Sequence, residues 1–224
     1  MDFVGSHIIS VDQFDREAAD RVFAVADRMR PYANRQRITR VLQGAILSNM
    51  FFEPSTRTRV SFGSAFNLLG GEVRETSEVK ASSLTKGESL YDTARVLSGY
   101  SDIIVMRHPE SGSGAEFAEA SRVPVINGGD GPNEHPSQAL LDLYTMRTEM
   151  AAQARTLDGM TIALVGDLRY GRAVHSLCKL LCLYDQVKLH LIAPPELSIP
   201  EEIEKKLVAD GHQVETFTDM AKGI

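Results

Sequence analysis

The fold of this chain is decided by residues 45–76, AILSNMFFEPSTRTRVSFGSAFNLLGGEVRET. The short apolar run at its start, up to Phe52, predicts a buried strand. Glu53-Pro54 interrupts that run, and a helix is predicted to follow over residues 55–69, where a glycine pair ends it. Residues 72–76 then predict a second strand. A strand, a helix and a strand in succession are typical of an α/β fold with a largely parallel sheet.

The same alternation of strand-like and helix-like segments continues along the chain. Further strands are predicted at residues 102–106, 123–127, 161–165, 187–192 and 213–217. Further helices are predicted at residues 15–30, 87–98, 115–120, 136–150, 171–183 and 200–210. Pro31 is expected to end the first helix, and the glycine-rich residues 128–132 are expected to form a loop. Residues 77–86 are polar and lack periodicity, which predicts an exposed loop.

Two units are predicted, each a doubly wound domain with a parallel sheet. Residues 151–159 are polar and carry no strand pattern, so we place the boundary there and expect domains over 1–150 and 151–224. The first unit has four predicted strands. The second has three, fewer than doubly wound domains usually carry, so it is expected to be incomplete in this chain.

Composition excludes several classes of protein. The two cysteines cannot build a disulfide framework, and a net charge of −6 argues against general nucleic-acid binding, which needs a basic face. No apolar run is long enough for a membrane span, and the N-terminus lacks a basic segment followed by an apolar core. A cytoplasmic location is therefore expected.

The sequence FEPSTRTR, residues 52–59, predicts an anion site. It places three hydroxyls and two guanidinium groups at the start of a helix, directly after a buried strand. A helix N-terminus offers unpaired N–H groups and partial positive charge, and arginine matches phosphate oxygens. A simpler interpretation is that Ser55 or Thr56 only caps the helix while Arg57 and Arg59 are solvated. The number of such groups favours a site where residues 55–59 converge on a phosphate dianion.

Other candidates lie where strands end and helices begin. Arg107 follows a buried strand, a position that often faces a ligand in α/β folds, although it can equally be a charge at a strand end. His135 and Gln138 share one helix face after a glycine-rich loop, although a histidine there can also simply pack. Cys178 and Cys182 lack the companions of a metal site, and core packing is expected for them.

These segments, taken in order, resemble the motifs of the carbamoyltransferases. The resemblance rests on residues 55–59, on SLTKGESL at 83–90, on VMRHP at 105–109, on GDG at 129–131 with HPSQALLD at 135–142, and on VGDLRYGRAVHSL at 165–177. The last segment is similar to the aspartate branch of the family rather than the ornithine branch. The resemblance implies transfer of a carbamoyl group from carbamoyl phosphate to the amine of L-aspartate, a step of pyrimidine biosynthesis, without a cofactor.

The resemblance also implies roles for individual residues. Those implied to hold the phosphate are Ser55, Thr56, Arg57 and Thr58, completed by Ser83 (or Ser82) and Lys86 from a neighbouring subunit of a homotrimer. Those implied to face the carbonyl oxygen are Thr58, Arg107 and His135. Gln138 would accept a hydrogen bond from the carbamoyl NH2, and Arg172 would bind an aspartate carboxylate. Glu53 would pair with Arg172 and bridge the two domains. The acceptor of the amine proton stays open between the phosphate and a nearby group.

This chain departs from the family pattern after Phe217. A loop that binds the second aspartate carboxylate and a His-Pro-x-Pro stretch are expected there and are missing from this sequence. We therefore expect this chain to bind carbamoyl phosphate better than it turns it over. Two alternatives remain: an ornithine carbamoyltransferase, and a non-catalytic homologous subunit or scaffold. Retention of the charged site residues argues against the scaffold, and the shortness of the chain argues for it. Regulatory chains and a dihydroorotase are open as partners.

Overall fold

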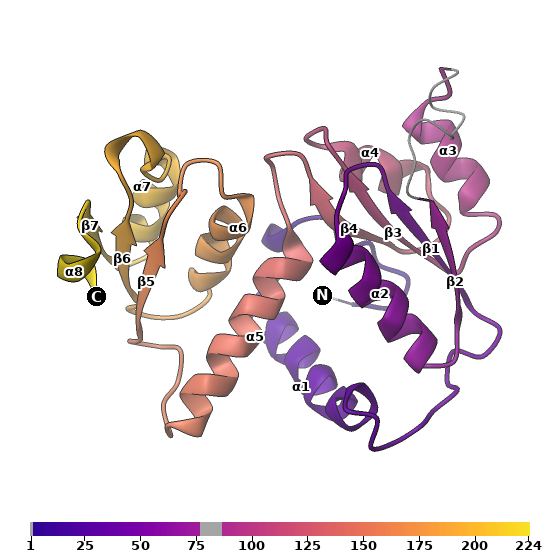
Figure 1. The fold of residues 1–224 in the computed structure, drawn as a ribbon, viewed down its shortest axis with the longest axis horizontal. Coiled ribbons are helices and arrows are strands. Elements are labelled where there is room, and N and C mark those ends of the chain that lie inside the picture. Colours follow the sequence, from indigo (N-terminus) through magenta and orange to yellow (C-terminus); the bar gives the residue numbers. More distant parts are fainter. Residues whose placement is uncertain (1, 77–86) are drawn as a thin grey trace.

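Two parallel sheets organise the molecule (Figure 1). The computed structural model describes residues 2–76 and 87–224. The first sheet has the strand order β2-β1-β3-β4, with β1 (Ile46–Phe51), β2 (Glu72–Thr76), β3 (Ile103–His108) and β4 (Val125–Asp130). The second has the order β5-β6-β7, with β5 (Thr161–Val165), β6 (Lys188–Ile192) and β7 (Gln213–Phe217). All neighbouring strands pair in parallel, which confirms the predicted fold class.

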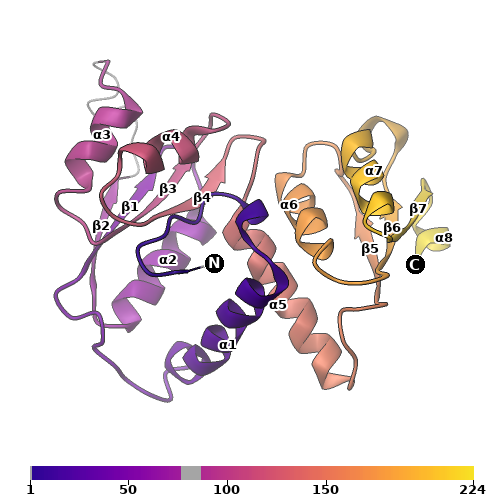
Figure 2. The same ribbon diagram turned by 180° about the vertical axis from the view of Figure 1, so that it is seen from behind.

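Helices connect the strands and cover the sheets. The α-helices are α1 (Arg16–Ala33), α2 (Thr56–Leu68), α3 (Leu90–Leu97), α4 (Ser113–Ala120), α5 (Pro136–Ala152), α6 (Arg172–Leu181), α7 (Glu201–Ala209) and α8 (Met220–Gly223). Two short 3-10 helices, η1 (Val11–Gln13) and η4 (Pro195–Leu197), join them. Helix α2 lies on one face of the first sheet, with α3 and α4 on the other (Figures 1 and 2). None of the helices in the described ranges is both long and apolar enough to cross a membrane.

The alternation of side chains along β3 explains how both faces of the first sheet are buried. Ile104 and Met106 point to one face and pack in a cluster with Phe117 of α4. Val105, between them, belongs to a cluster on the opposite face, against which Phe62 of α2 packs. A strand buried on both faces is continuously apolar, as parallel sheets require. The helices of both faces are thereby fixed relative to the ends of the strands.

Helix α5 joins the two halves of the molecule (Figure 1). Its residues Ala139 and Leu143 are fully buried in one cluster with Leu177 of α6, Phe23 of α1 and Leu189 of β6. This cluster is continuous from the helices beside the first sheet to the second sheet. The start of α5 and the start of α6 are therefore held close to each other, near the carboxyl ends of the strands of the first sheet.

Three local predictions were wrong in their boundaries. Helix α1 continues past Pro31 to Ala33, because a proline in the last turn removes only one hydrogen bond and the remaining ones still form. Helix α3 begins at Leu90 instead of residue 87, because the Ser89 side chain caps it by accepting a hydrogen bond from the Asp92 N–H. The glycine-rich stretch is partly strand, since β4 extends to Asp130.

The extended glycine stretch has a physical cause in the pairing of β3 with β4. The register shifts between Met106 and His108, so that His108 pairs with Asp130. Gly129 has φ +115°, which a residue with a side chain rarely adopts. The other strands, including the four of the first sheet and the three of the second, and helices α2 and α4 to α7 occur close to where they were predicted. Helix α8 and the two 3-10 helices were not predicted.

Candidate functional site

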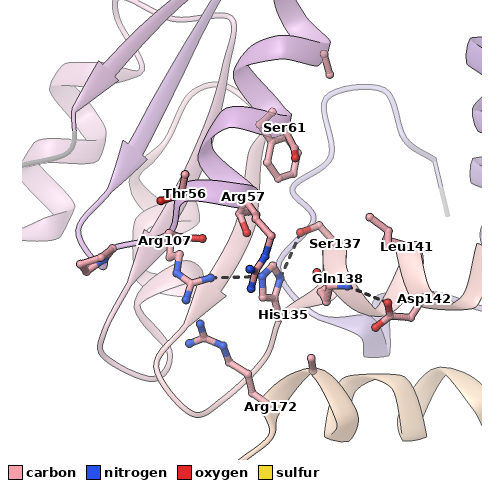
Figure 3. Close-up of a pocket in the computed structure, with 16 residues that line it drawn as sticks. Thr56, Arg57, Ser61, Arg107, His135, Ser137, Gln138, Leu141, Asp142 and Arg172 are labelled. Atoms are coloured by element: carbon pink, nitrogen blue, oxygen red, sulfur yellow. Dashed lines mark hydrogen bonds between the residues drawn. The ribbon is translucent and has the colours of Figure 1, made fainter. Parts of the chain in front are cut away.

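A cavity of about 1040 Å³ opens where four elements meet. The elements are the N-termini of α2, α5 and α6 and the carboxyl end of β3. Its lining includes Ser55, Thr56, Arg57, Thr58, Ser61, Arg107, His135, Ser137, Gln138, Leu141, Asp142 and Arg172 (Figure 3). In α/β folds ligands bind beyond the carboxyl ends of parallel strands. The position of the cavity therefore matches the position expected of a ligand site.

The N-terminus of α2 presents donors to this cavity. Ser55 is the N-cap residue, yet its side chain makes no capping hydrogen bond, and the first turn holds no acidic residue. The Ser55 hydroxyl therefore does not cap the helix, whereas Arg57 is exposed, as the simpler interpretation expected. Arg57 lines the same cavity as His135 (Figure 3). Backbone N–H groups, hydroxyls and this guanidinium form a positively polarised surface suited to an oxyanion.

Arg59 does not belong to the site, and its expected convergence with Arg57 is wrong. Its guanidinium is paired with Glu75 of β2, and its backbone carbonyl accepts a hydrogen bond from Asn49 Nδ2 at 2.9 Å. Two residues along an α-helix correspond to a rotation of about 200°, so Arg57 and Arg59 face nearly opposite sides of α2.

Arg107 at the end of β3 is 9% exposed and lies among acceptors. Its Nη2 donates to Glu53 Oε1 at 2.8 Å, and its Nη1 donates to the Gly128 carbonyl at 3.4 Å. A Cβ atom on Gly129 would come within 3.3 Å of both the Arg107 and the Arg172 guanidinium. Glycine at this bulge is therefore what allows the two cations to lie against the backbone.

Glu53 lies between the two arginines. It forms ion pairs with Arg107 at 2.8 Å and with Arg172 at 3.4 Å, and Arg172 also donates to the Gly131 carbonyl. Burial by itself raises the pKa of Glu53, but the hydrogen bonds from Arg107 and Arg172 outweigh it and lower that pKa. The sequence suggested only Arg172 as the partner of Glu53, whereas the nearer partner is Arg107.

His135 is a neutral imidazole beside these charges. It is 7% exposed, with Nε2 at 3.5 Å from Arg107 Nη1 and Nδ1 at 3.3 Å from Ser137 Oγ. Burial, followed by the positive charges of Arg107 and Arg172, lowers the pKa of His135 to about 4.

Two residues of α5 complete the described part of the site. Gln138 Nε2 donates to Asp142 Oδ1 at 2.9 Å, and both side chains line the cavity. Ser137 and Asp142 were not among the site residues predicted from the sequence. The spacing of four residues between Gln138 and Asp142, which places both on one helix face, was the signal available for Asp142.

Three residues that the sequence placed at the phosphate cannot be located, because Ser82, Ser83 and Lys86 lie outside the described residues. Cys178 is 1% exposed and packs in the core, and burial raises the pKa of its thiol to about 12, which confirms the expected packing role. Over residues 2–76 and 87–224, no three histidine, cysteine or carboxylate side chains are grouped so that they could hold a metal ion.

Comparison with known proteins places the chain in a family. Residues 6–148 match the carbamoyl-phosphate-binding domain of the aspartate/ornithine carbamoyltransferases. The chain belongs to the aspartate/ornithine carbamoyltransferase family. It is 65% identical, over its whole length, to the aspartate carbamoyltransferase catalytic subunit of Saccharophagus degradans, of which it covers 66%. This carbamoyltransferase chain thus spans slightly less than two thirds of the length of that relative.

Solved carbamoyltransferase structures share the fold. The catalytic subunit of Methanocaldococcus jannaschii aspartate transcarbamoylase superimposes with a TM-score of 0.89 and 45% identity, covering 97% of this chain and 70% of that chain. The Trypanosoma cruzi aspartate transcarbamoylase in complex with carbamoyl phosphate and aspartate superimposes with a TM-score of 0.87 and 38% identity, covering 96% of this chain and 72% of that chain.

Proposed function

We propose that this chain is the carbamoyl-phosphate-binding part of an aspartate carbamoyltransferase, together with the beginning of its aspartate-binding part. The observation that carries the proposal is the meeting of Arg57, Arg107, His135 and Gln138 around one cavity at the N-terminus of α2. These groups supply what an acyl phosphate needs: donors for a dianion, cationic donors for a carbonyl oxygen, and an acceptor for an amide NH2.

The phosphate is proposed to bind at the start of α2. The cavity is lined there by Ser55, Thr56, Arg57 and Thr58. The N–H groups of the first turn have no partner within the helix and point out of its N-terminal end. Lys86 and Ser83 are proposed to complete this site from a neighbouring subunit of a homotrimer. A shared site of this kind makes the oligomer the active form.

Transfer is proposed to proceed without a covalent enzyme intermediate. The amine nitrogen of L-aspartate attacks the carbamoyl carbon, the bond from that carbon to the bridging phosphate oxygen breaks, and the nitrogen gives its proton to the leaving phosphate or to a nearby group. Arg107, with His135 and Thr58, faces the carbonyl oxygen, where negative charge develops in the transition state. Phosphate leaves as an anion that Arg57 and the α2 N-terminus continue to stabilise.

Arg172, the first residue of α6, is proposed to bind an aspartate carboxylate. Its guanidinium contacts Glu53 and the Gly131 carbonyl. Glu53 then bridges residues 1–150, the proposed carbamoyl-phosphate domain, and residues 151–224, the start of the proposed aspartate domain. The names of the relatives support aspartate over ornithine as the acceptor. A cytoplasmic location is part of the proposal.

Binding and transfer test the proposal separately. Isothermal titration of the chain with carbamoyl phosphate is expected to show saturable binding that inorganic phosphate competes away. Transfer is then measured with carbon-labelled carbamoyl phosphate and either L-aspartate or L-ornithine, and labelled carbamoyl aspartate is the expected product. Absence of binding by carbamoyl phosphate, or labelled product only with ornithine, would overturn the proposal.

A further inference from the structure

The two ends of the Gln138 amide have opposite chemistry, and only one of them suits a carbamoyl group. The Oε1 atom accepts hydrogen bonds, whereas the Nε2 atom only donates them. A carbamoyl NH2 needs an acceptor, so Gln138 can bind it only if Oε1 is turned toward the ligand. A rotation by 180° about the last side-chain torsion exchanges the two ends at little cost in shape. Something must therefore decide which end faces the cavity.

Asp142 lies where it can fix the orientation of the Gln138 amide. It lies one helical turn after Gln138 on α5, and its Oδ1 accepts a hydrogen bond from Gln138 Nε2 at 2.9 Å. The amide lies between His135 and Asp142, with its nitrogen toward the carboxylate (Figure 3). An ionised carboxylate has acceptors only, so it can pair with the NH2 end and not with the carbonyl end.

The backbone holds this pair in place. Ala139 and Leu143, the residues immediately after Gln138 and Asp142, are fully buried in the core cluster that joins α5 to α6. Helix α5 therefore cannot turn, and both side chains stay at the cavity wall. Burial raises the pKa of Asp142, and the hydrogen bond from Gln138 opposes that rise. The hydrogen bond thus stabilises the ionised form of Asp142, and the carboxylate in turn fixes the orientation of the Gln138 amide.

We propose that Asp142 is a positioning residue that sets acyl specificity: by holding Gln138 Nε2 it turns Oε1 to the ligand and selects an acyl phosphate that carries an NH2 donor. This inference rests on the proposed function. The site is expected to bind carbamoyl phosphate more tightly than acetyl phosphate. Acetyl phosphate has the same phosphate and carbonyl groups but a methyl in place of the NH2. A site built to pair a donor discriminates against an analogue that lacks it.

Binding constants of carbamoyl phosphate, acetyl phosphate and inorganic phosphate test the proposal in the wild-type chain and in Asp142→Leu. The readout is the ratio of the two acyl phosphate affinities, because a general change in charge or folding affects both ligands alike. Asp142→Leu is expected to reduce the preference for carbamoyl phosphate by about fivefold, the scale of one hydrogen bond, through weaker carbamoyl phosphate binding. Glu149→Gln, which removes an exposed negative charge from the same helix, is the control and should leave the ratio unchanged.

A conservative variant and a ligand-independent measurement complete the test. Asp142→Asn keeps an acceptor oxygen of similar size and is expected to retain part of the preference. If Asp142→Leu does not fold, Asp142→Asn is compared with wild type by the NMR shifts of the Gln138 side-chain NH2 protons, which should move. Equal losses for both acyl phosphates, or an unchanged ratio, would overturn the inference alone. If the wild-type chain binds neither acyl phosphate, the proposed function fails and the inference fails with it.

Discussion

The Glu53 carboxylate contacts Arg172 across 119 positions of sequence, with Oε1 at 3.4 Å from Nη2. This ion pair connects the loop after β1 to the first turn of α6 in the second half of the chain. The same carboxylate accepts from Arg107 at 2.8 Å. Glu53 thus provides the negative charge between two largely buried guanidinium groups. A dianion bound in the cavity that Arg107 and Arg172 line would supply charge of the same sign.

Replacing Glu53 by glutamine tests this arrangement. Glu53→Gln leaves Arg107 and Arg172 without their carboxylate, so the variant is expected to be less stable than wild type in the absence of ligand, by about 1–3 kcal/mol. Phosphate should restore stability, because it replaces the missing negative charge. We therefore expect a larger phosphate-induced rise in Tm for the variant than for wild type, measured by thermal unfolding.

The control for this prediction is Glu72→Gln, which removes an exposed carboxylate from β2. Its phosphate-induced shift should match that of wild type. An identical shift in Glu53→Gln and wild type would contradict the role given to Glu53.

The two arginines at the start of α2 offer a matched pair of substitutions. Arg57 lines the cavity, whereas Arg59 pairs with Glu75 on the other side of the helix. Arg57→Ala is expected to weaken inorganic phosphate binding by at least about tenfold, since a charge-assisted hydrogen bond is lost. Arg59→Ala should change binding by less than about twofold and stability by less than about 1 kcal/mol, as for other surface ion pairs. Calorimetric titration with phosphate measures the affinity of both variants. Equal losses of affinity would contradict the placement of Arg57 in the cavity and Arg59 outside it.

His135 should make stability depend on pH in a defined direction. Its pKa is about 4 in the folded chain against an ordinary value of 6.5, so between these values the unfolded chain binds more protons. Unfolding free energy therefore rises with pH across this window, and the contribution is lost as pH falls from 6.5 toward 4. A shift of this size corresponds to between about 3 and 3.5 kcal/mol.

Urea unfolding at pH 5 and pH 7.5 measures this contribution in wild type and in His135→Gln. Burial also lowers the pKa values of His7, His108 and His212, which act in the same direction but are present in both proteins. The difference between the two proteins thus isolates His135. The same loss of stability on acidification in both would show that His135 is not held neutral.

Lys179 on α6 provides a test of the junction between the two halves. Its Nζ lies 2.6 Å from Glu134, whose side chain is 7% exposed and also accepts from the Val11 N–H at 2.8 Å. Lys179→Met is expected to destabilise the chain by about 2–3 kcal/mol, because it leaves a buried carboxylate without its cation. The double variant Lys179→Met/Glu134→Gln should recover part of that loss.

Lys206→Met is the matched control. Lys206 pairs with Asp210 at 3.0 Å on the surface of the second half, and its removal should cost less than about 1 kcal/mol. Chemical denaturation measures all three proteins. Equal effects of Lys179→Met and Lys206→Met would contradict the importance of the Glu134 contact.

The amino-acid sequence alone specifies the order of the elements, the parallel sheets and the cluster of hydroxyls and guanidinium groups at the start of α2. These features depend on short-range patterns: apolar runs of strand length, helix periodicity, and Pro and Gly at the breaks. Such patterns are fixed by sterics and burial within a few residues. Where prediction erred, as at residues 128–132, long-range pairing of β4 with β3 overrode the local preference of glycine for a turn.

The partners that complete the site come together through tertiary packing. Arg107 meets Glu53 from 54 positions away, and His135 loses its charge because packing buries it beside two guanidinium groups. The pairing of Gln138 with Asp142 was available as a helix spacing, but its meaning depends on which face of α5 the core buries. Partners and pKa values of this kind depend on distances between distant segments, and these distances are set by the packing of the whole molecule.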